Sequence, residues 1–318
     1  MQQSYVNGRS TDGGCEMKIM IGCDVDPVLP ARLATPPGGD VWEPLGHIPA
    51  LISEMGEELP PVTWLIRSDA SVHFATGDYA SGYLARRDLW SRLAHRGDEL
   101  GWHMHLLSFS EEQGAFVFDP EPVWLTDAFD ALARHIPVRA TRTGWDFANN
   151  FLFARLDDLG IELDFSALPG NRVWSAVGGS PFIVDWLGSP DRPYHPSTDD
   201  YRRPGGEELR MLEVPIAQFP NSTSGVLKRL AWRLRNGCLS FSGLRNKTRM
   251  LTDPWQELPH SAGEVWAFYF HPEDLTDEGI RNFVRNVERL RGLPDAEFFT
   301  AGAMLHWYGV TGPRGGER

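Results

Sequence analysis

The chain has 318 residues, of which 42% are apolar and 11% are aromatic. This composition is sufficient for a sizeable core, in one large α/β barrel or in two ordinary domains. The formal net charge of −13 argues against a general nucleic-acid-binding protein. The sequence contains no apolar run long enough to span a membrane.

The first residues are polar and rich in glycine and serine, and they lack the apolar segment of a signal peptide. We expect residues 1–16 to form a disordered leader. The three cysteines, Cys15, Cys23 and Cys238, have neither a metal-type spacing nor the pattern of a disulfide framework, which fits a reducing compartment. The sequence therefore predicts a cytoplasmic protein with a single domain over residues 17–318.

In chain order, apolar runs of strand length alternate with segments of helical apolar spacing. Strands are expected over residues 17–26, 62–66, 99–105, 140–145, 161–168, 211–219, 265–270 and 297–300. Helices are expected over residues 44–59, 83–96, 122–135, 149–159 and 276–293. A long irregular insertion, rich in Pro, Gly and Asp, is predicted at 170–209, and a second insertion around 221–262. Repeated strand–helix units predict a parallel sheet closed into a barrel, with its chemistry at the carboxyl ends of the strands.

Two carboxylates follow the first apolar run. Asp24 and Asp26 alternate along one strand and share a face, where they repel each other unless a cation or a proton separates them. His103 and His105 share a face of the third strand in the same way, and an aspartate with two histidines is a reasonable ligand set for a catalytic divalent metal. Either pair alone is more typical of a solvated turn or a surface histidine, but two pairs at strand ends indicate a metal site.

Another histidine, His271, ends the apolar strand at residues 265–270, and histidine is suited to acid or base chemistry near neutral pH. The alternative for His271 is a structural hydrogen bond to a loop. Arg142 also lies at a strand end, where an ordinary salt bridge is the alternative to a functional role.

Four short motifs occur in a characteristic order: Cys23-Asp24-Val25-Asp26, Gly97-Asp98-Glu99-Leu100-Gly101-Trp102-His103, Thr141-Arg142-Thr143-Gly144-Trp145 and Phe270-His271-Pro272. In this order they resemble the motifs of the polysaccharide deacetylase family, the NodB-homology or family 4 carbohydrate esterases. The resemblance runs from about Met17 to about Trp307. It implies an α/β fold, a distorted (β/α) barrel of about seven strands, and hydrolysis of an N-acetyl or related amide bond with a divalent metal ion.

The resemblance also implies catalytic and substrate-binding roles. Asp24 would be the general base that takes a proton from water, and Arg142 would hold it ionised and oriented. His271 would be the general acid that protonates the leaving amine. Trp145 and Tyr194 are expected to contact the substrate.

For the metal ion, the resemblance implies Asp26 and His103 as ligands, with zinc as the expected ion. The usual second histidine lies four residues after the first, and here that position holds Leu107. We expect His105 to replace it, because His105 and His103 face the same way on a strand. The rival candidates are His47, His73 and His306.

Residues 221–250 contain seven basic and no acidic residues. A solvated basic helix packed on the barrel is the favoured interpretation of this segment. The alternatives are a site for an anionic substrate and a weak contact with an anionic membrane.

Three functional classes remain open from the sequence. The leading one is a metal-dependent amide hydrolase that removes an acyl group, with N-acetyl expected, from a sugar or glycan precursor. The second is a cyclic amide or ureide hydrolase of the same barrel family. The third is a non-catalytic glycan-binding relative, suggested by Leu107 in the place of a metal ligand.

Overall fold

The computed structural model describes residues 17–30, 33–220, 245–246, 251–259 and 264–309. The leader expected at residues 1–16 and nearly all of the basic segment 221–250 lie outside these ranges, so the expectations for them stay predictions. Among the helices in the described ranges, none combines the length and the apolar character needed to cross a membrane.

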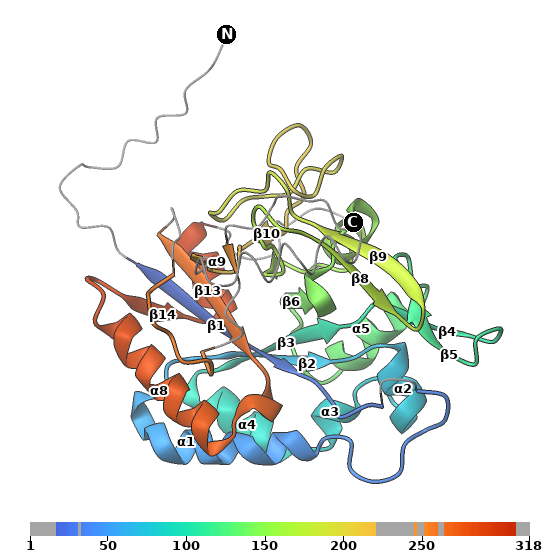
Figure 1. The fold of residues 1–318 in the computed structure, drawn as a ribbon, viewed down its shortest axis with the longest axis horizontal. Coiled ribbons are helices and arrows are strands. Elements are labelled where there is room, and N and C mark those ends of the chain that lie inside the picture. Colours follow the sequence, from blue (N-terminus) through green and yellow to red (C-terminus); the bar gives the residue numbers. More distant parts are fainter. Residues whose placement is uncertain (1–16, 31–32, 221–244, 247–250, 260–263, 310–318) are drawn as a thin grey trace, which may run out of the picture.

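One sheet of parallel strands organises the chain (Figure 1). Its strands follow the order β10 (Leu212–Glu213), β7 (Leu163–Asp164), β6 (Ala140–Thr143), β3 (Glu99–Met104), β2 (Thr63–Arg67), β1 (Lys18–Val25) and β13 (Val265–Phe270). A further strand, β14 (Glu297–Phe299), pairs with β1. A lone parallel bridge between Ile216 and Ala267 links the two ends of this order. The sheet therefore curls into a distorted (β/α) barrel, and the fold predicted from the sequence is confirmed.

The centre of the sheet is apolar on both faces. Every residue of β1 and of β13 is buried, as expected for strands of a parallel sheet that is covered on both sides. Gly101 allows β3 and β6 to approach, because a Cβ atom there would lie 2.6 Å from the carbonyl oxygen of Ala140. The residues after these strands are consequently held at fixed positions along one edge of the sheet.

The described helices are α1 (Ile48–Met55), α2 (Ala70–Thr76), α3 (Ser81–Leu84), α4 (Arg87–Arg96), α5 (Leu125–Ala133), α6 (Asn150–Asp158), α8 (Asp277–Arg291) and α9 (Ala301–Tyr308). Helices α1, α4 and α8 lie together along one side of the sheet in Figure 1. The helix predicted at 44–59 is shorter than expected. A 3₁₀ turn at Glu43–His47 precedes α1, and each begins with a proline in its first turn, where the missing N–H costs nothing.

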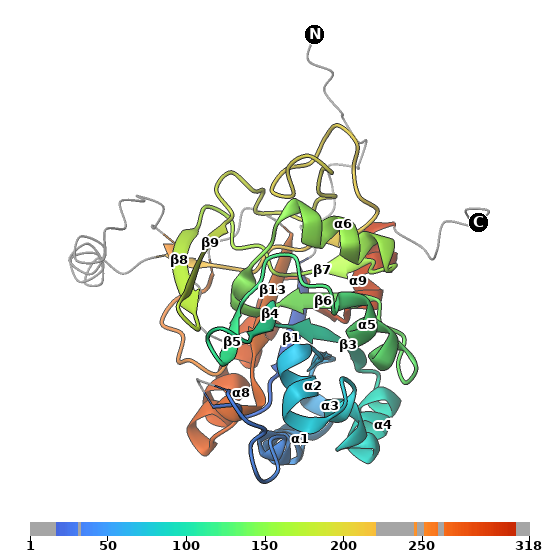
Figure 2. The same ribbon diagram turned by 90° about the vertical axis from the view of Figure 1, so that its right-hand side faces the viewer.

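Two antiparallel hairpins were not predicted. The insertion at 170–209, expected to be irregular, contains β8 (Arg172–Val177) and β9 (Ser180–Asp185), which are joined by Gly178 and Gly179 at positive φ. A second hairpin of β4 (Leu107–Ser110) and β5 (Ala115–Phe118) follows β3. The two hairpins lie side by side, as Figure 2 shows.

Several predicted strands are shorter in the structure. Of residues 161–168 only Leu163–Asp164 are strand, and of 211–219 only Leu212–Glu213 and Phe219, the start of β11 (Phe219–Pro220). After β7 the backbone N–H groups of Ser166 and Ala167 donate to the side chains of Asp164 and Glu213 instead of to a neighbouring strand. β11 pairs antiparallel with β12 (Arg245–Asn246), outside the main sheet.

Candidate metal centre and active site

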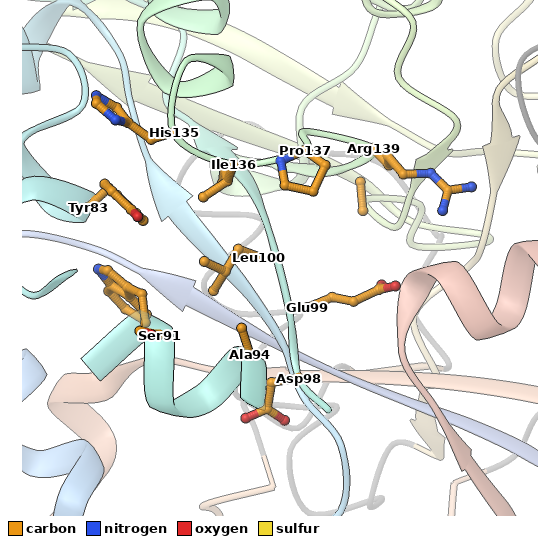
Figure 3. A pocket seen from close by; sticks show the side chains of 12 residues that line it. Tyr83, Ser91, Ala94, Asp98, Glu99, Leu100, His135, Ile136, Pro137 and Arg139 are labelled. Atoms are coloured by element: carbon orange, nitrogen blue, oxygen red, sulfur yellow. The ribbon is translucent and has the colours of Figure 1, made fainter. Parts of the chain in front are cut away.

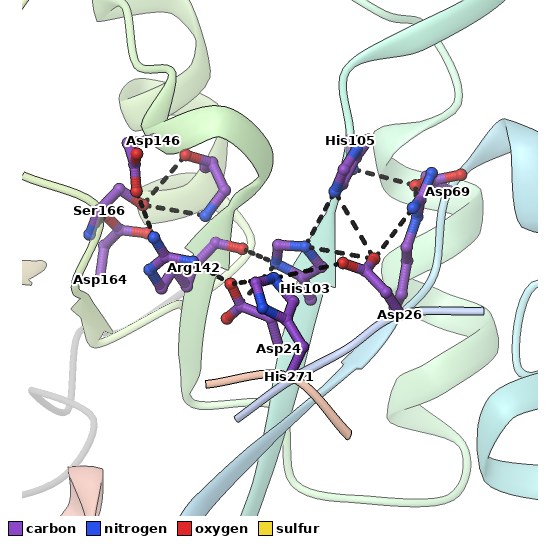
Figure 4. A network of polar contacts seen from close by, with 12 residues as sticks. Asp24, Asp26, Asp69, His103, His105, Arg142, Asp146, Asp164, Ser166 and His271 are labelled. Carbon is purple, nitrogen blue, oxygen red and sulfur yellow. Dashed lines mark hydrogen bonds and ion pairs between the residues drawn. The ribbon is translucent and has the colours of Figure 1, made fainter. Parts of the chain in front are cut away.

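Most of the predicted site residues meet in one pocket. Asp24 and Asp26 come from the end of β1, His103 and Arg142 from β3 and β6, and His271 directly follows β13. Figure 4 shows these side chains turned toward one another at the carboxyl edge of the sheet. They line a cavity of about 190 Å³ together with His105, Gly144, Trp145, Asp146, Tyr269 and Glu273.

Tyr194, expected to contact the substrate, does not line this cavity. It is buried, and its hydroxyl donates to the carbonyl oxygen of Tyr201 at 3.1 Å. Trp145 does line the cavity, where the edge of its ring meets His105 at a centroid distance of 4.3 Å.

Asp26, His103 and His105 form the one group of potential metal ligands found among the described residues. His103 Nε2 and His105 Nε2 are 3.1 Å apart, and each lies 3.6 Å from Asp26 Oδ1. Ligand atoms bound to a tetrahedral zinc ion at about 2.0–2.1 Å are about 3.3–3.4 Å apart. The three separations therefore suit a small divalent ion with an open fourth position.

The protonation of the two histidines also suits a metal. His103 Nδ1 lies 2.7 Å from the carbonyl oxygen of Arg142. A carbonyl only accepts, so Nδ1 carries the hydrogen, and the tautomer that binds a metal would present its lone pair at Nε2. Burial and the charge of Arg67 hold the pKa of His105 well below its ordinary 6.5, which keeps that ring neutral as well.

Asp26 supplies the charge of this set. Burial alone would raise the pKa of Asp26, but the charged groups around it, Arg67 and His271 among them, lower it below the ordinary 3.8. The carboxylate is therefore ionised at any ordinary pH, as a metal ligand must be.

Arg142 holds Asp24 in a fixed position. Arg142 donates to Asp24 and to Asp146, and its guanidinium lies over the ring of Tyr269, 3.6 Å from the ring centroid. The other carboxylate oxygen of Asp24, Oδ1, is buried and has no hydrogen-bond partner among the described residues. One carboxylate oxygen is thus fixed by Arg142, and the other keeps its capacity to accept a hydrogen bond.

His271 is oriented by Asp274 and faces the two aspartates of the site. Its Nε2 lies 3.7 Å from Asp24 Oδ2 and 3.7 Å from Asp26 Oδ2, so it faces the same cavity. Its Nδ1 lies 3.2 Å from Asp274 Oδ2, which also accepts from the backbone N–H of His271. Burial opposes protonation of His271, but the hydrogen bond to Asp274 and the nearby aspartates outweigh it and raise the pKa of the ring.

The loop after β6 fits closely around His105. Trp145 and Asp146 both have φ of 58°, the left-handed region that side chains rarely adopt. Gly144 has no space for a side chain, because a Cβ atom there would lie 2.3 Å from His105 Cδ2. Thr143 anchors the loop through its N–H, which donates to the hydroxyl oxygen of Ser166 at 2.9 Å.

A buried carboxyl pair lies behind Arg142. Asp164 and Glu213 are neighbours in register on β7 and β10, and both are fully buried, each with one carboxylate oxygen that accepts no hydrogen bond from a described residue. Two neighbouring carboxyl groups can hydrogen-bond to each other only if one holds a proton. Burial raises the pKa of Asp164 to about 6, and burial together with Asp164 raises the pKa of Glu213 well above its ordinary 4.5.

Sequence analysis missed Arg67, Asp69, Asp146 and Asp274, which surround the predicted residues. Arg67 and Asp69 lie at the end of the strand expected at 62–66, so the rule that chemistry follows strand ends would have found them. Asp146 and Asp274 carry no such signal, because their position depends on the turns after Arg142 and His271.

Neither Leu107 nor the rival histidines His47, His73 and His306 belong to the candidate ligand group. Leu107 packs with Leu33 and Phe116 in a small apolar cluster, and it is the first residue of β4. His47 Nδ1 lies 3.2 Å from the carbonyl oxygen of Pro272, and the candidate group includes neither His73 nor His306.

A larger cavity, of about 350 Å³, lies at the opposite ends of β3 and β6 (Figure 3). None of the predicted site residues lines it. Its acidic groups already have partners, since Asp98 accepts from Val62 N–H and Arg96, and Glu99 accepts from Gly302 N–H. Of these two cavities, the smaller one is the one that brings the predicted site residues together.

No protein-family model matches the chain. No curated protein sequence matches it either. Among solved structures, a protein from Mycobacterium smegmatis assigned as a polysaccharide deacetylase is 14% identical, with a TM-score of 0.52 over 98% of this chain and 96% of that chain. A 4-α-glucanotransferase from Thermococcus litoralis is 12% identical, with a TM-score of 0.44 over 92% of this chain and 40% of that chain.

A Bordetella bronchiseptica protein assigned as a polysaccharide deacetylase of O-antigen biosynthesis is also 12% identical, with a TM-score of 0.40 over 86% of this chain and 89% of that chain. The two TM-scores below 0.5 support no argument. At 14% identity the similarity to the Mycobacterium smegmatis protein concerns the fold alone, and at that level the relation expected from the motifs is confirmed.

Proposed function

We propose that this protein is a metal-dependent hydrolase that removes an acyl group, with N-acetyl expected, from a nitrogen of a sugar or glycan precursor. The observation that carries the proposal is the convergence of a metal-ligand set with an acceptor and a donor of protons. Asp24 and His271 lie next to each other beside Asp26 and the two histidines, with His271 Nε2 3.7 Å from a carboxylate oxygen of each aspartate. One carboxylate and two neutral imidazoles, with an open position, favour zinc.

A bound divalent ion there would supply Lewis-acid polarisation of the acyl oxygen and would make water a stronger nucleophile. Asp24 would accept the proton of the attacking water through Oδ1, the oxygen that no described residue engages. Arg142, already bound to Asp24 and Asp146, would keep that carboxylate in place while it gains the proton.

His271 would give its proton to the leaving nitrogen. Asp274 fixes the orientation of the ring through Nδ1, so that Nε2 points into the cavity. The raised pKa of His271 favours its protonated form, which an acid for an amine leaving group requires. Trp145 is proposed to contact the substrate, since it forms an aromatic wall of the cavity.

Metal analysis of the purified protein, combined with an assay of acyl release from a panel of N-acetylated amino sugars, tests the proposal. We expect about one equivalent of metal and a release of acetate that Asp24→Asn abolishes. Asp40→Asn is the matched control, because Asp40 lies at the surface and pairs with Arg86. A metal-free protein that still binds sugar would support the non-catalytic alternative, and cleavage of a cyclic amide but no acetylated sugar would support the second class.

A further inference from the structure

We propose that Arg67 and Asp69 form a frame that holds Asp26 and His105 together and thereby makes His105 a metal ligand. This inference rests on the proposed function, since it takes Asp26, His103 and His105 to be the ligand set. It goes further because it explains how His105 could serve as a ligand in this chain, where Leu107 stands at the position of the second histidine in the motif that the sequence resembles.

His105 needs such a frame because the sheet does not hold it. β3 ends at Met104, so the backbone of His105 lies beyond the ladder that fixes His103. Two residues later the chain enters β4, where Leu107 packs into the apolar cluster with Leu33 and Phe116. The direction of His105 must therefore be set by a contact outside the sheet.

Asp69 makes that contact. It is fully buried, and its Oδ2 accepts the backbone N–H of His105 at 3.0 Å. Its other oxygen, Oδ1, accepts from the N–H groups of Ser71 and Val72 and so caps helix α2. Because a helix N-terminus holds Asp69, the backbone of His105 is anchored to a fixed point.

Arg67 connects this anchor to Asp26. Its Nε donates to Asp69 Oδ2 at 2.7 Å and its Nη1 to Asp26 Oδ1 at 2.9 Å. Its Nη2 donates to the hydroxyl oxygen of Ser71 at 2.9 Å. The planar guanidinium is thus held at three points in a buried position, so it fixes Asp26 in place.

The four groups form a closed circuit. It runs from Asp26 through Arg67 and Asp69 to the backbone of His105, and His105 Nε2 returns to Asp26 Oδ1 at 3.6 Å. A cation beside a metal ligand would by itself weaken metal binding. The opposite charge of Asp69, bonded to the same guanidinium, offsets most of that effect, so the orientation of Asp26 and His105 dominates.

The experiment measures zinc affinity by competition with a chromophoric chelator, which needs no turnover. We expect Arg67→Met to raise the dissociation constant for zinc by about 10- to 100-fold. Arg67→Lys keeps the charge but cannot bond Asp26, Asp69 and Ser71 at once, and it should weaken binding by at least about threefold. Arg96→Met is the control and should bind zinc as the unchanged protein does, because Arg96 pairs with Asp98 away from the site.

Unchanged or tighter binding in the Arg67 variants would overturn the frame and make Arg67 a competitor of the metal ion. If Arg67→Met does not fold, as judged by circular dichroism, Arg67→Lys decides between these outcomes. A failure of the proposed function is distinguishable, because in that case the unchanged protein binds no zinc.

Discussion

The buried carboxyl pair of Asp164 and Glu213 should make the protein less stable as the pH rises, and the substitution Glu213→Gln tests this. In the unchanged protein the pair holds a proton that the unfolded chain gives up at lower pH. In the variant the amide of the new glutamine has its own N–H to donate to Asp164, so the hydrogen bond no longer depends on a proton from solution.

The size of this loss of stability follows from the pKa of Asp164, which is about 6 in the folded protein against an ordinary 3.8. Above pH 3.8 the unfolded chain loses this proton first, so the folded state binds more protons and the free energy of unfolding falls with rising pH. A difference of one between the folded and unfolded pKa values corresponds to about 1.4 kcal/mol. The difference for Asp164 therefore lowers the free energy of unfolding by about 3 kcal/mol, and this loss is complete above about pH 6. The raised pKa of Glu213 acts in the same direction and extends the loss to higher pH.

Urea denaturation at pH 4, 5, 6 and 7 measures this loss, provided that the slope against urea stays constant. We expect the unchanged protein to lose more stability than Glu213→Gln does between pH 4 and pH 7, because the variant keeps the burial of Asp164 but lacks the second carboxyl group, whose pKa is also raised. Glu43→Gln, at a side chain that is 70% exposed, should follow the unchanged protein. Equal losses in the unchanged protein and in Glu213→Gln would refute the shared proton.

Three further predictions concern the candidate site. Asp24→Asn should abolish turnover and leave the metal bound. Loss of the metal in this variant would instead make Asp24 the metal ligand and Asp26 the general base. His271→Ala should slow amide cleavage and remove the alkaline limb of the pH–rate profile, because the histidine acts in its protonated form; an unchanged profile would exclude it. Gly144→Ala should weaken zinc binding at least about tenfold by displacing His105, whereas Gly46→Ala, where a Cβ atom meets nothing within 4 Å, should bind zinc normally.

The parallel sheet was predictable because its central strands are strongly patterned. β1 is apolar from Ile19 to Cys23 and β13 is apolar throughout, and such runs separated by helical segments leave little choice of fold. The edge strands β7 and β10 were predicted too long, since two-residue strands leave almost no pattern in a sequence. The hairpin of β8 and β9 carried a signal in its two turn glycines, which the high Pro and Gly content of the segment obscured.

The candidate site was predictable where side chains follow strand ends, as Asp24, Asp26 and His103 do. His105 was inferred from strand parity, but it lies one residue beyond β3, and its direction depends on Asp69. Contacts of this kind join residues far apart in the sequence, so no local pattern reveals them. Tyr194 illustrates the same limit, because nothing in its neighbours indicates that its ring is buried away from the cavity.

The pairing of β1 with β13 has a consequence for folding during translation. Lys18 pairs with Val265, so β1 is synthesised long before the strand that pairs with it. At about 5–20 residues per second, roughly ten seconds to a minute separates the two. During that time one apolar edge of β1 has no permanent neighbour, and Asp24 has not yet met His271. A nascent chain halted before Val265 would lack both the pairing of β1 with β13 and the contact of Asp24 with His271. The sheet and the candidate active site should therefore be completed together, late in translation.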